Sequence, residues 1–317
     1  MTQPARPVDI GVLVPVGHAP GEEFEDWAGS VRRWEDLGVT ALVVEDDGAG
    51  DVTALEPLTL LSALATATER IGLVASVPAD GEAAYAFARK IASLDHLSAG
   101  RAGWRLVASR TVAGGWVTPS DGDRAAYADE VVEAVRGLWD TVADDAFPRD
   151  QESGVFLDRR GRRTLDHRGT HVVTSGPINV SRPPQGHPVL VQTAASADEL
   201  SAAARRADVV VVDDAAVATG LDAALAAHGR ARETVRAWRR VPGAAPPDTL
   251  VERVAAETLD GVLLAFDDVR TADGALSRLL PLLRERGLAG SRGSGTLRAA
   301  LSLPRPALAI ADMEADA

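Results

Sequence analysis

Eight short apolar segments, each followed by a segment of helical periodicity, run through most of this sequence. The apolar segments are rich in Val, Ile and Leu, and this alternation is typical of repeated βα units around a parallel sheet. We expect strands at Asp9 to Pro15, Val39 to Glu45, Ile71 to Val77, Gly103 to Ala108, Pro188 to Thr193, Ala207 to Val212, Val235 to Val241 and Gly261 to Phe266. We expect helices at Glu22 to Leu37, Ala54 to Glu69, Ala84 to Leu97, Arg124 to Asp140, Ala197 to Arg206, Val217 to His228, Asp248 to Glu257 and Ala275 to Arg286.

Eight βα pairs favour a closed (β/α)8 barrel, the TIM-barrel fold, over an open doubly wound sheet. The chain has 317 residues, of which 46% are hydrophobic, so we expect one domain over residues 1–317. The even spacing is interrupted at Thr141 to His187, where only Val155 to Leu157 and His171 to Val173 look extended. We interpret this stretch as an insertion between the fourth βα unit and the fifth strand that shapes one mouth of the barrel. Residues 309–317 are expected to form a mobile tail.

The charge of the chain limits its partners. Lys and Arg number 33 against 46 for Asp and Glu, a net charge of −13, which repels phosphate backbones and anionic lipids. We therefore expect neither nucleic acid nor a membrane as a partner. The absence of cysteine excludes disulfides, thiolate metal sites and a cysteine nucleophile. No signal-peptide pattern or apolar run of about 18 residues is apparent, so a cytoplasmic protein is the expectation.

A long motif carries a resemblance to a known family. The run from Phe87 to Trp104, FARKIASLDHLSAGRAGW, is similar to a signature of the nitrilotriacetate and dibenzothiophene-sulfone monooxygenase branch of the bacterial-luciferase-like flavin-dependent monooxygenases. Shorter agreements occur at Asp166 to His171, Gly176 to Val180, Arg182 to Gly186 and Val189 to Gln192. The resemblance extends from about Val8 to Leu308 with missing pieces, because the chain is shorter than is usual for the branch.

The resemblance implies an activity and partners. Members of this branch bind reduced FMN that a separate flavin reductase delivers, react it with O2 and oxygenate a small organic substrate. The protein positions the flavin, and the flavin carries the redox chemistry. The resemblance also implies a homodimer that forms through the helices beside the signature run.

Several positions that match the branch's flavin contacts have changed. Pro78 and Ala79 follow Ser76 where the branch has a hydroxyl-rich segment, so hydroxyl donors and a backbone N–H are missing. Arg105 stands where the branch carries an Asn, and an Arg offers five donors and no acceptor. The resemblance assigns cofactor-binding positions to Asp46, Ser76, Arg105, Gln192, Ala195 and Ser196.

The positions that match the branch's phosphate site are altered too. Ser196 and Glu199 have the spacing of a capping box, in which side chains bind the N–H groups that a phosphate would need. Asp198 and Glu199 add negative charge there, and Leu200 replaces the branch's Arg. We therefore expect FMN either to bind more weakly than in the relatives or to have been lost.

No catalytic residue is assigned by the sequence, and the candidates are His18, Arg105 and His167. His167 and His171 are four residues apart, but no third ligand has a suitable spacing, so no metal is expected. Glu45 and Asp46 end a strand where barrel enzymes carry their sites, or they cap the next helix.

Three functional hypotheses remain open at this point. The first is an FMN-dependent monooxygenase-like oxidoreductase that acts on a small organic substrate with O2. The second is a non-catalytic or flavin-losing paralogue that keeps the barrel. The third is a barrel enzyme with a different cofactor or none.

Overall fold

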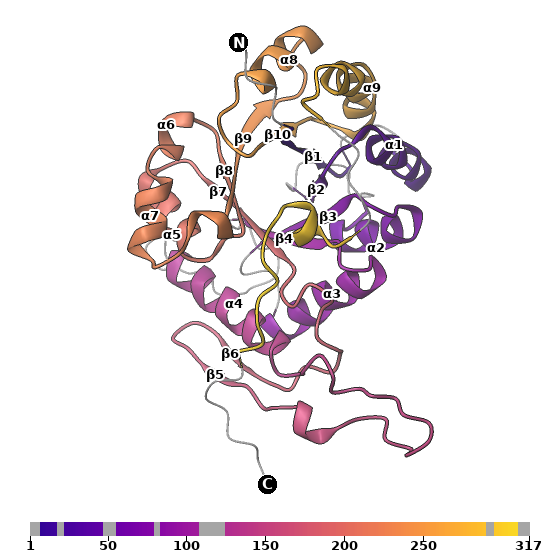
Figure 1. Cartoon of the computed structure of the whole chain (residues 1–317), viewed down its shortest axis with the longest axis vertical. Coiled ribbons are helices and arrows are strands. Elements are labelled where there is room, and N and C mark those ends of the chain that lie inside the picture. The colour runs from indigo at the N-terminus through magenta and orange to yellow at the C-terminus, as the bar shows by residue number, and fades with distance from the viewer. Residues whose placement is uncertain are drawn as a thin grey trace.

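The computed structural model describes residues 7–17, 22–46, 55–78, 83–107, 124–289 and 295–309. Eight parallel strands form a closed barrel in the order β1-β10-β9-β8-β7-β4-β3-β2, so the predicted (β/α)8 barrel is confirmed (Figure 1). The strands are β1 (Asp9–Pro15), β2 (Ala41–Glu45), β3 (Gly72–Pro78), β4 (Ala102–Val107), β7 (Val189–Ala194), β8 (Val209–Val212), β9 (Arg236–Pro242) and β10 (Gly261–Ala265). Each begins and ends within two residues of its predicted position.

The helices form a ring outside the strands (Figure 1). They are α1 (Phe24–Leu37), α2 (Pro57–Ala67), α3 (Ala84–Leu97), α4 (Arg124–Trp139), α5 (Ala197–Arg206), α6 (Ala215–Ala218), α7 (Leu221–Ala227), α8 (Pro247–Ala255) and α9 (Val269–Glu285), and a further helix, α10 (Leu297–Ala300), lies apart from the ring. Two expectations were wrong in detail. The helix expected at Val217 to His228 is divided into α6 and α7 at Gly220, and α9 begins before Ala275 because Asp268 caps it.

The interior of the barrel is filled by side chains. One buried cluster takes residues from every strand except β4, and its largest member is Trp238. A Cβ atom on Gly11 would lie 2.8 Å from the Trp238 ring, and one on Gly261 would also lie 2.8 Å from it. These two glycines therefore provide the space for the indole, whose Nε1–H donates to Asp9 at 3.2 Å.

Helix α10 closes the N-terminal end of the barrel and crosses the centre of the ring in Figure 1. Leu297 packs against the strands where they carry Gly72 and Gly103. A Cβ atom on Gly72 would lie 2.5 Å from Leu297 Cδ1. Periodicity does not predict this helix, because a helix of one turn is too short to show any.

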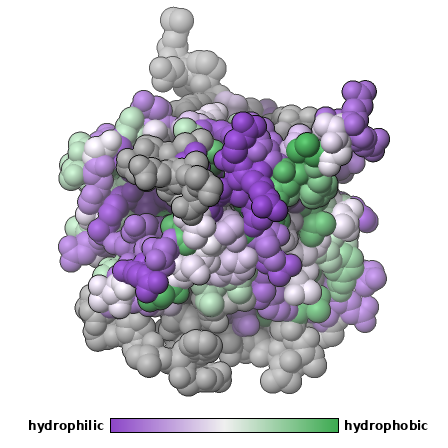
Figure 2. Space-filling view, turned by 90° about the horizontal axis from the view of Figure 1, so that it is seen from below, coloured by the Kyte–Doolittle hydropathy of each residue, from purple (hydrophilic) through white to green (hydrophobic). Residues whose placement is uncertain are grey.

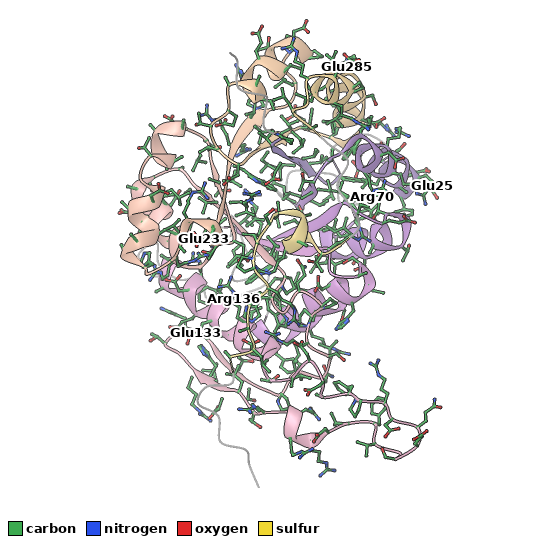
Figure 3. The ribbon with its side chains drawn as sticks, in the orientation of Figure 1. Glu25, Arg70, Glu133, Arg136, Glu233 and Glu285 are labelled. Atoms are coloured by element: carbon green, nitrogen blue, oxygen red, sulfur yellow. The ribbon has the colours of Figure 1, made fainter. Side chains whose placement is uncertain are left out.

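A buried ion pair fixes α10 in place. Arg298 donates to Asp208 at 2.8 Å, and Asp208 also accepts from the Leu190 N–H at 2.8 Å. Arg136, labelled on α4 in Figure 3, lies 3.6 Å from the same carboxylate. Burial favours the neutral form of Asp208, but the two guanidinium groups outweigh it and lower the pKa of this carboxyl. The C-terminal segment is thus tied to strands β7 and β8.

The insertion is present where it was predicted, between α4 and β7, but its described residues lie beside the barrel and not over its mouth (Figure 1). It contains a hairpin of β5 (Asp166–Arg168) and β6 (Val173–Ser175), whereas the stretch expected to be extended at Val155 to Leu157 is not a strand. The Glu130 carboxylate on α4 accepts the N–H groups of Thr170, His171 and Val172, which attaches the hairpin to the helix layer.

The described surface is mixed in character. Figure 2 shows the molecule from the end where the insertion lies, and hydrophilic and hydrophobic residues are interspersed over it. None of the helices in the described part of the chain combines the length and the apolar composition that a membrane span requires. The large apolar side chains that stand exposed are Leu55, Leu97, Val155, Phe156 and Val173.

The contact between α10 and the barrel gives a prediction. Leu297→Ala should lower the free energy of unfolding by about 2–4 kcal/mol, because it leaves a cavity under the strands. Gly72→Ala should lower it by about 1–3 kcal/mol, since its new methyl group meets the Leu297 side chain. In the double variant the methyl group fits the cavity, so urea unfolding should show a loss smaller than the sum. A strictly additive result would contradict this packing.

A second prediction concerns pH. Burial lowers the pKa of His187 below its ordinary 6.5, although its 2.9 Å hydrogen bond with Asp140 acts in the opposite direction. The unfolded chain therefore binds the proton more readily, and stability should fall as the pH drops below about 6.5. The loss in free energy of unfolding between pH 7 and 5 should be smaller in His187→Gln, while exposed His96→Gln should behave as the parent does. Equal pH dependence in all three proteins would contradict the argument.

Candidate active site

Four strands bring polar side chains together at the C-terminal mouth of the barrel, around Arg105. Its Nη1 donates to Glu45 Oε2 at 2.6 Å and to Ser76 Oγ at 3.2 Å. Its Nη2 donates to Thr193 Oγ1 at 3.3 Å. The Arg105 side chain is 10% exposed and that of Glu45 is 22% exposed, so the ion pair is largely shielded from water. We call these four residues the mouth cluster.

Strand register explains why these residues meet. Val74 lies inside the barrel and is paired with Gly103, so Ser76 and its partner Arg105, two residues further along, also face inward. Thr193 stands two residues after buried, inward-facing Val191 on β7. Since all the strands are parallel, their C-terminal ends lie at one mouth, where barrel enzymes carry out their chemistry.

One hydrogen-bond donor of the Arg105 guanidinium is not used by the described residues. Its Nε is buried and has no hydrogen-bond partner among the described residues, while both terminal nitrogens are used within the mouth cluster. A buried donor without a partner is costly, and it suits a ligand that brings an acceptor such as a carbonyl or a ring nitrogen. The mouth cluster can therefore orient a polar heteroaromatic ring and stabilise negative charge on it.

The start of α5 is closed by its own side chains. Ser196 Oγ accepts the Glu199 N–H at 3.3 Å, and the Glu199 carboxylate accepts the Ala195 N–H at 2.7 Å. The capping contacts expected from the sequence are thus present. The Glu199 carboxylate binds the N–H of Ala195, which is one residue before the N-cap residue Ser196. Leu200 is buried at 3% exposure and faces the helix layer. These residues do not fit a phosphate group, because two of the N–H groups at this helix start are already bonded by side chains and the side chains of Asp198 and Glu199 are acidic.

The other residues expected at a flavin site lie in different surroundings. Gln192 points away from the mouth, and its carbonyl oxygen accepts from Arg206 Nε of α5 at 3.0 Å. Burial lowers the pKa of Arg206 to about 10. Asp46 is exposed directly after Glu45, and Pro78 ends β3. His18 and Ala79 lie outside the described residues.

The structure separates His167 from the mouth cluster. It lies on β5 in the hairpin outside the barrel (Figure 1), and its buried Nε2 has no partner among the described residues. His171 packs edge-on against Tyr127 of α4, with ring centroids 6.1 Å apart. No group of three or more potential ligands within the described part of the chain is arranged to hold a metal ion.

The sequence patterns did not identify two of the residues at the mouth. Thr193 is predicted only as the end of a strand, and Arg240 is given no role. Arg240 stands two residues after inward-facing Trp238 on β9 and is exposed at the mouth. The alternation of side chains along a strand is the signal that could have identified both.

A closed (β/α)8 barrel whose strands end around a shielded ion pair has the architecture of a barrel enzyme. Residues 8–248 match the family model described as luciferase-like monooxygenase. Because this match covers more than half of the 317 residues, the chain belongs to the luciferase-like monooxygenase family.

The curated relatives include the two enzymes that the sequence resemblance pointed to. The chain is 40% identical to nitrilotriacetate monooxygenase component A of Aminobacter aminovorans, over 57% of this chain and 43% of that protein. It is 37% identical to dibenzothiophene-sulfone monooxygenase of Rhodococcus erythropolis, over 47% of this chain and 34% of that protein. It is 43% identical to N-acetyl-S-(2-succino)cysteine monooxygenase of Bacillus subtilis, over 50% of this chain and 37% of that protein. The matches thus cover less than half of the length of each of these relatives.

The fold also matches solved structures. EDTA monooxygenase from Chelativorans sp. BNC1 superimposes with a TM-score of 0.79 at 19% identity, covering 96% of this chain and all of that one. At this level of identity the superposition establishes the shared fold.

The mouth cluster gives a stability prediction. Glu45→Gln should lower the free energy of unfolding by about 1–3 kcal/mol, because it leaves the shielded Arg105 cation without its counter-charge. Glu285→Gln is the control, since Glu285 is exposed at the end of α9 and is labelled in Figure 3. Equal stability of the two variants in chemical unfolding would show that the Glu45 pair contributes nothing.

Proposed function

We propose that this chain is an FMN-dependent monooxygenase-like oxidoreductase that acts on a small organic substrate with O2. Reduced FMN would come from a separate flavin reductase. The observation that carries the proposal is the buried Nε of Arg105, which has no partner among the described residues, at the mouth of a barrel in the luciferase-like monooxygenase family. Hydrogen-bond donors beside a flavin ring are one means by which a protein tunes that cofactor.

The residues of the mouth cluster would have distinct roles. Arg105 would donate from Nε to an acceptor on the ring edge and so orient the ring. Glu45, Ser76 and Thr193 would hold the guanidinium in one orientation through the bonds they already make. When bound, the reduced flavin supplies the electrons that activate O2. No catalytic residue is proposed beyond Arg105, because His167 lies in the outer hairpin.

A second candidate, a paralogue that keeps the barrel but has lost flavin, is favoured by the start of α5. There Glu199 occupies the Ala195 N–H, and a phosphate would meet carboxylates in place of donors. Nitrilotriacetate monooxygenase component A is, by its name, one component of an enzyme. We propose that a flavin-free chain of this family would act as such a component. For either candidate we also propose a cytoplasmic homodimer.

Flavin titration separates the two candidates. Under anaerobic conditions the parent should bind reduced FMN, and Arg105→Lys should weaken binding by about tenfold, because Lys keeps the charge but loses the planar set of donors. Anaerobic calorimetry measures both constants, and thermal unfolding of the Lys variant checks that it is folded. If the parent binds no reduced flavin at several hundred micromolar, whether or not the flavin side chain ends in a phosphate, the first candidate is wrong and the flavin-free paralogue is supported.

A further inference from the structure

We infer that the mouth of this barrel selects a flavin with an uncharged side chain, such as riboflavin, over one that ends in a phosphate. The inference rests on the proposed function in that it takes a flavin ring as the ligand of the mouth cluster. It is carried by a separate observation, namely the carboxylates at the N-termini of the helices that begin around the mouth.

Helix N-termini are where a barrel of this kind would hold a phosphate. Each helix that follows a strand begins at the mouth with unpaired N–H groups and the positive end of its dipole. Phosphates bind there because those groups point at the ligand. A carboxylate from the chain that already accepts these N–H groups competes with the phosphate directly and repels it.

Three of the long helices carry such a carboxylate in the described structure. At α2, Glu56 accepts the N–H groups of residues 58 and 59 at 3.0 and 2.8 Å. At α5, Glu199 accepts the Ala195 N–H at 2.7 Å. At α9, Asp268 accepts the Thr271 N–H at 2.7 Å. Burial favours the neutral form of Asp268, but the hydrogen bonds it accepts from Thr271 outweigh burial and lower the pKa of this carboxyl. The Asp268 carboxylate is therefore charged at neutral pH.

The same arrangement recurs at two further positions. Asp26 accepts the Glu23 N–H at the start of α1 at 3.3 Å, and Asp214 accepts the Ala216 N–H at 2.9 Å at the start of α6. The Asp26 carboxylate also pairs with Arg270 of α9 at 2.8 Å, so its charge is balanced. Helix α8 begins with Pro247, which has no N–H, and carries Asp248 in its first turn. Among the helices of the outer ring whose N-terminal cap the structure describes, only α3 starts without an acidic residue in its cap or first turn.

The cations of the mouth do not reverse this balance. Arg105 is neutralised by Glu45 at 2.6 Å. Arg240 is exposed and makes no hydrogen bond or ion pair with a described residue. Asp213 follows β8 directly, and the pairing of Val212 with Arg239 puts Asp213 level with Arg240 on the neighbouring strand. The register thus places a carboxylate residue on the strand next to Arg240.

The ring of a flavin would therefore be stabilised at the mouth, whereas its terminal phosphate would be repelled. The isoalloxazine ring finds a buried donor in Arg105 Nε, whereas a terminal phosphate faces a rim of charged carboxylates. Repulsion between like charges weakens as salt screens it, so the affinity for FMN should rise with ionic strength. If cations held the phosphate, the affinity for FMN would instead fall as the ionic strength rises. The affinity for riboflavin, whose side chain is neutral, should be nearly independent of salt.

The test is a titration of the purified chain with riboflavin, FMN and inorganic phosphate at low and high salt, followed by flavin fluorescence. Riboflavin should bind at least about tenfold more tightly than FMN at low salt, and the ratio should shrink at high salt. Inorganic phosphate should not compete with riboflavin. Glu199→Gln and Glu56→Gln keep an acceptor oxygen but remove a charge, so each should strengthen FMN binding and leave riboflavin unchanged. Glu285→Gln, at the far end of α9, is the matched control for charge.

Three outcomes would overturn the inference. If FMN binds as tightly as riboflavin or more tightly, the side-chain preference is wrong while the proposed flavin function stands. If Arg240→Gln weakens FMN and not riboflavin, the phosphate is held by that arginine. If neither flavin binds, the proposed function fails, and the inference fails with it.

Discussion

Closure of the barrel by pairing of β1 with both β2 and β10 is the constraint on which the rest of the structure depends. An eight-stranded barrel is only wide enough for side chains to fill, so its interior must be packed and its two ends must differ. Trp238 fills the interior where Gly11 and Gly261 leave room. The N-terminal end is closed by α10 through Leu297, and polar groups are left to the C-terminal end.

The mouth cluster follows from this division. Strand β4 contributes no side chain to the buried cluster inside the barrel, because its inward positions at that level are Gly103 and Arg105. A guanidinium shielded in this way requires a counter-charge and hydrogen-bond acceptors, and Glu45, Ser76 and Thr193 supply them. The acidic helix starts around the mouth satisfy the local N–H groups in a similar manner. The inferred preference for a ring over a phosphate depends on these two arrangements.

Local patterns in the sequence predicted much of the fold but only part of the site. The strand at Asp9–Pro15 and the helices at Ala84–Leu97 and Ala197–Arg206 were predicted to the residue, because side-chain period and end signals lie within each segment. The capping of α5 by Ser196 and Glu199 was predictable for the same reason. Helix α10 was not predicted, since its stability comes from contacts with distant strands.

The alternation of apolar and amphipathic segments was enough to predict the strands, the helices and the closed barrel, and the signature at residues 87–104 was enough to indicate the family. Which side chains meet at the strand ends depends on the packing of the folded chain. Gln192 and Thr193 are neighbours in the chain, yet one faces Arg206 and the other faces Arg105, because successive side chains on a strand point to opposite faces. The partner of Arg105 lies 60 residues away on β2, and only the register of parallel strands brings the two charges together.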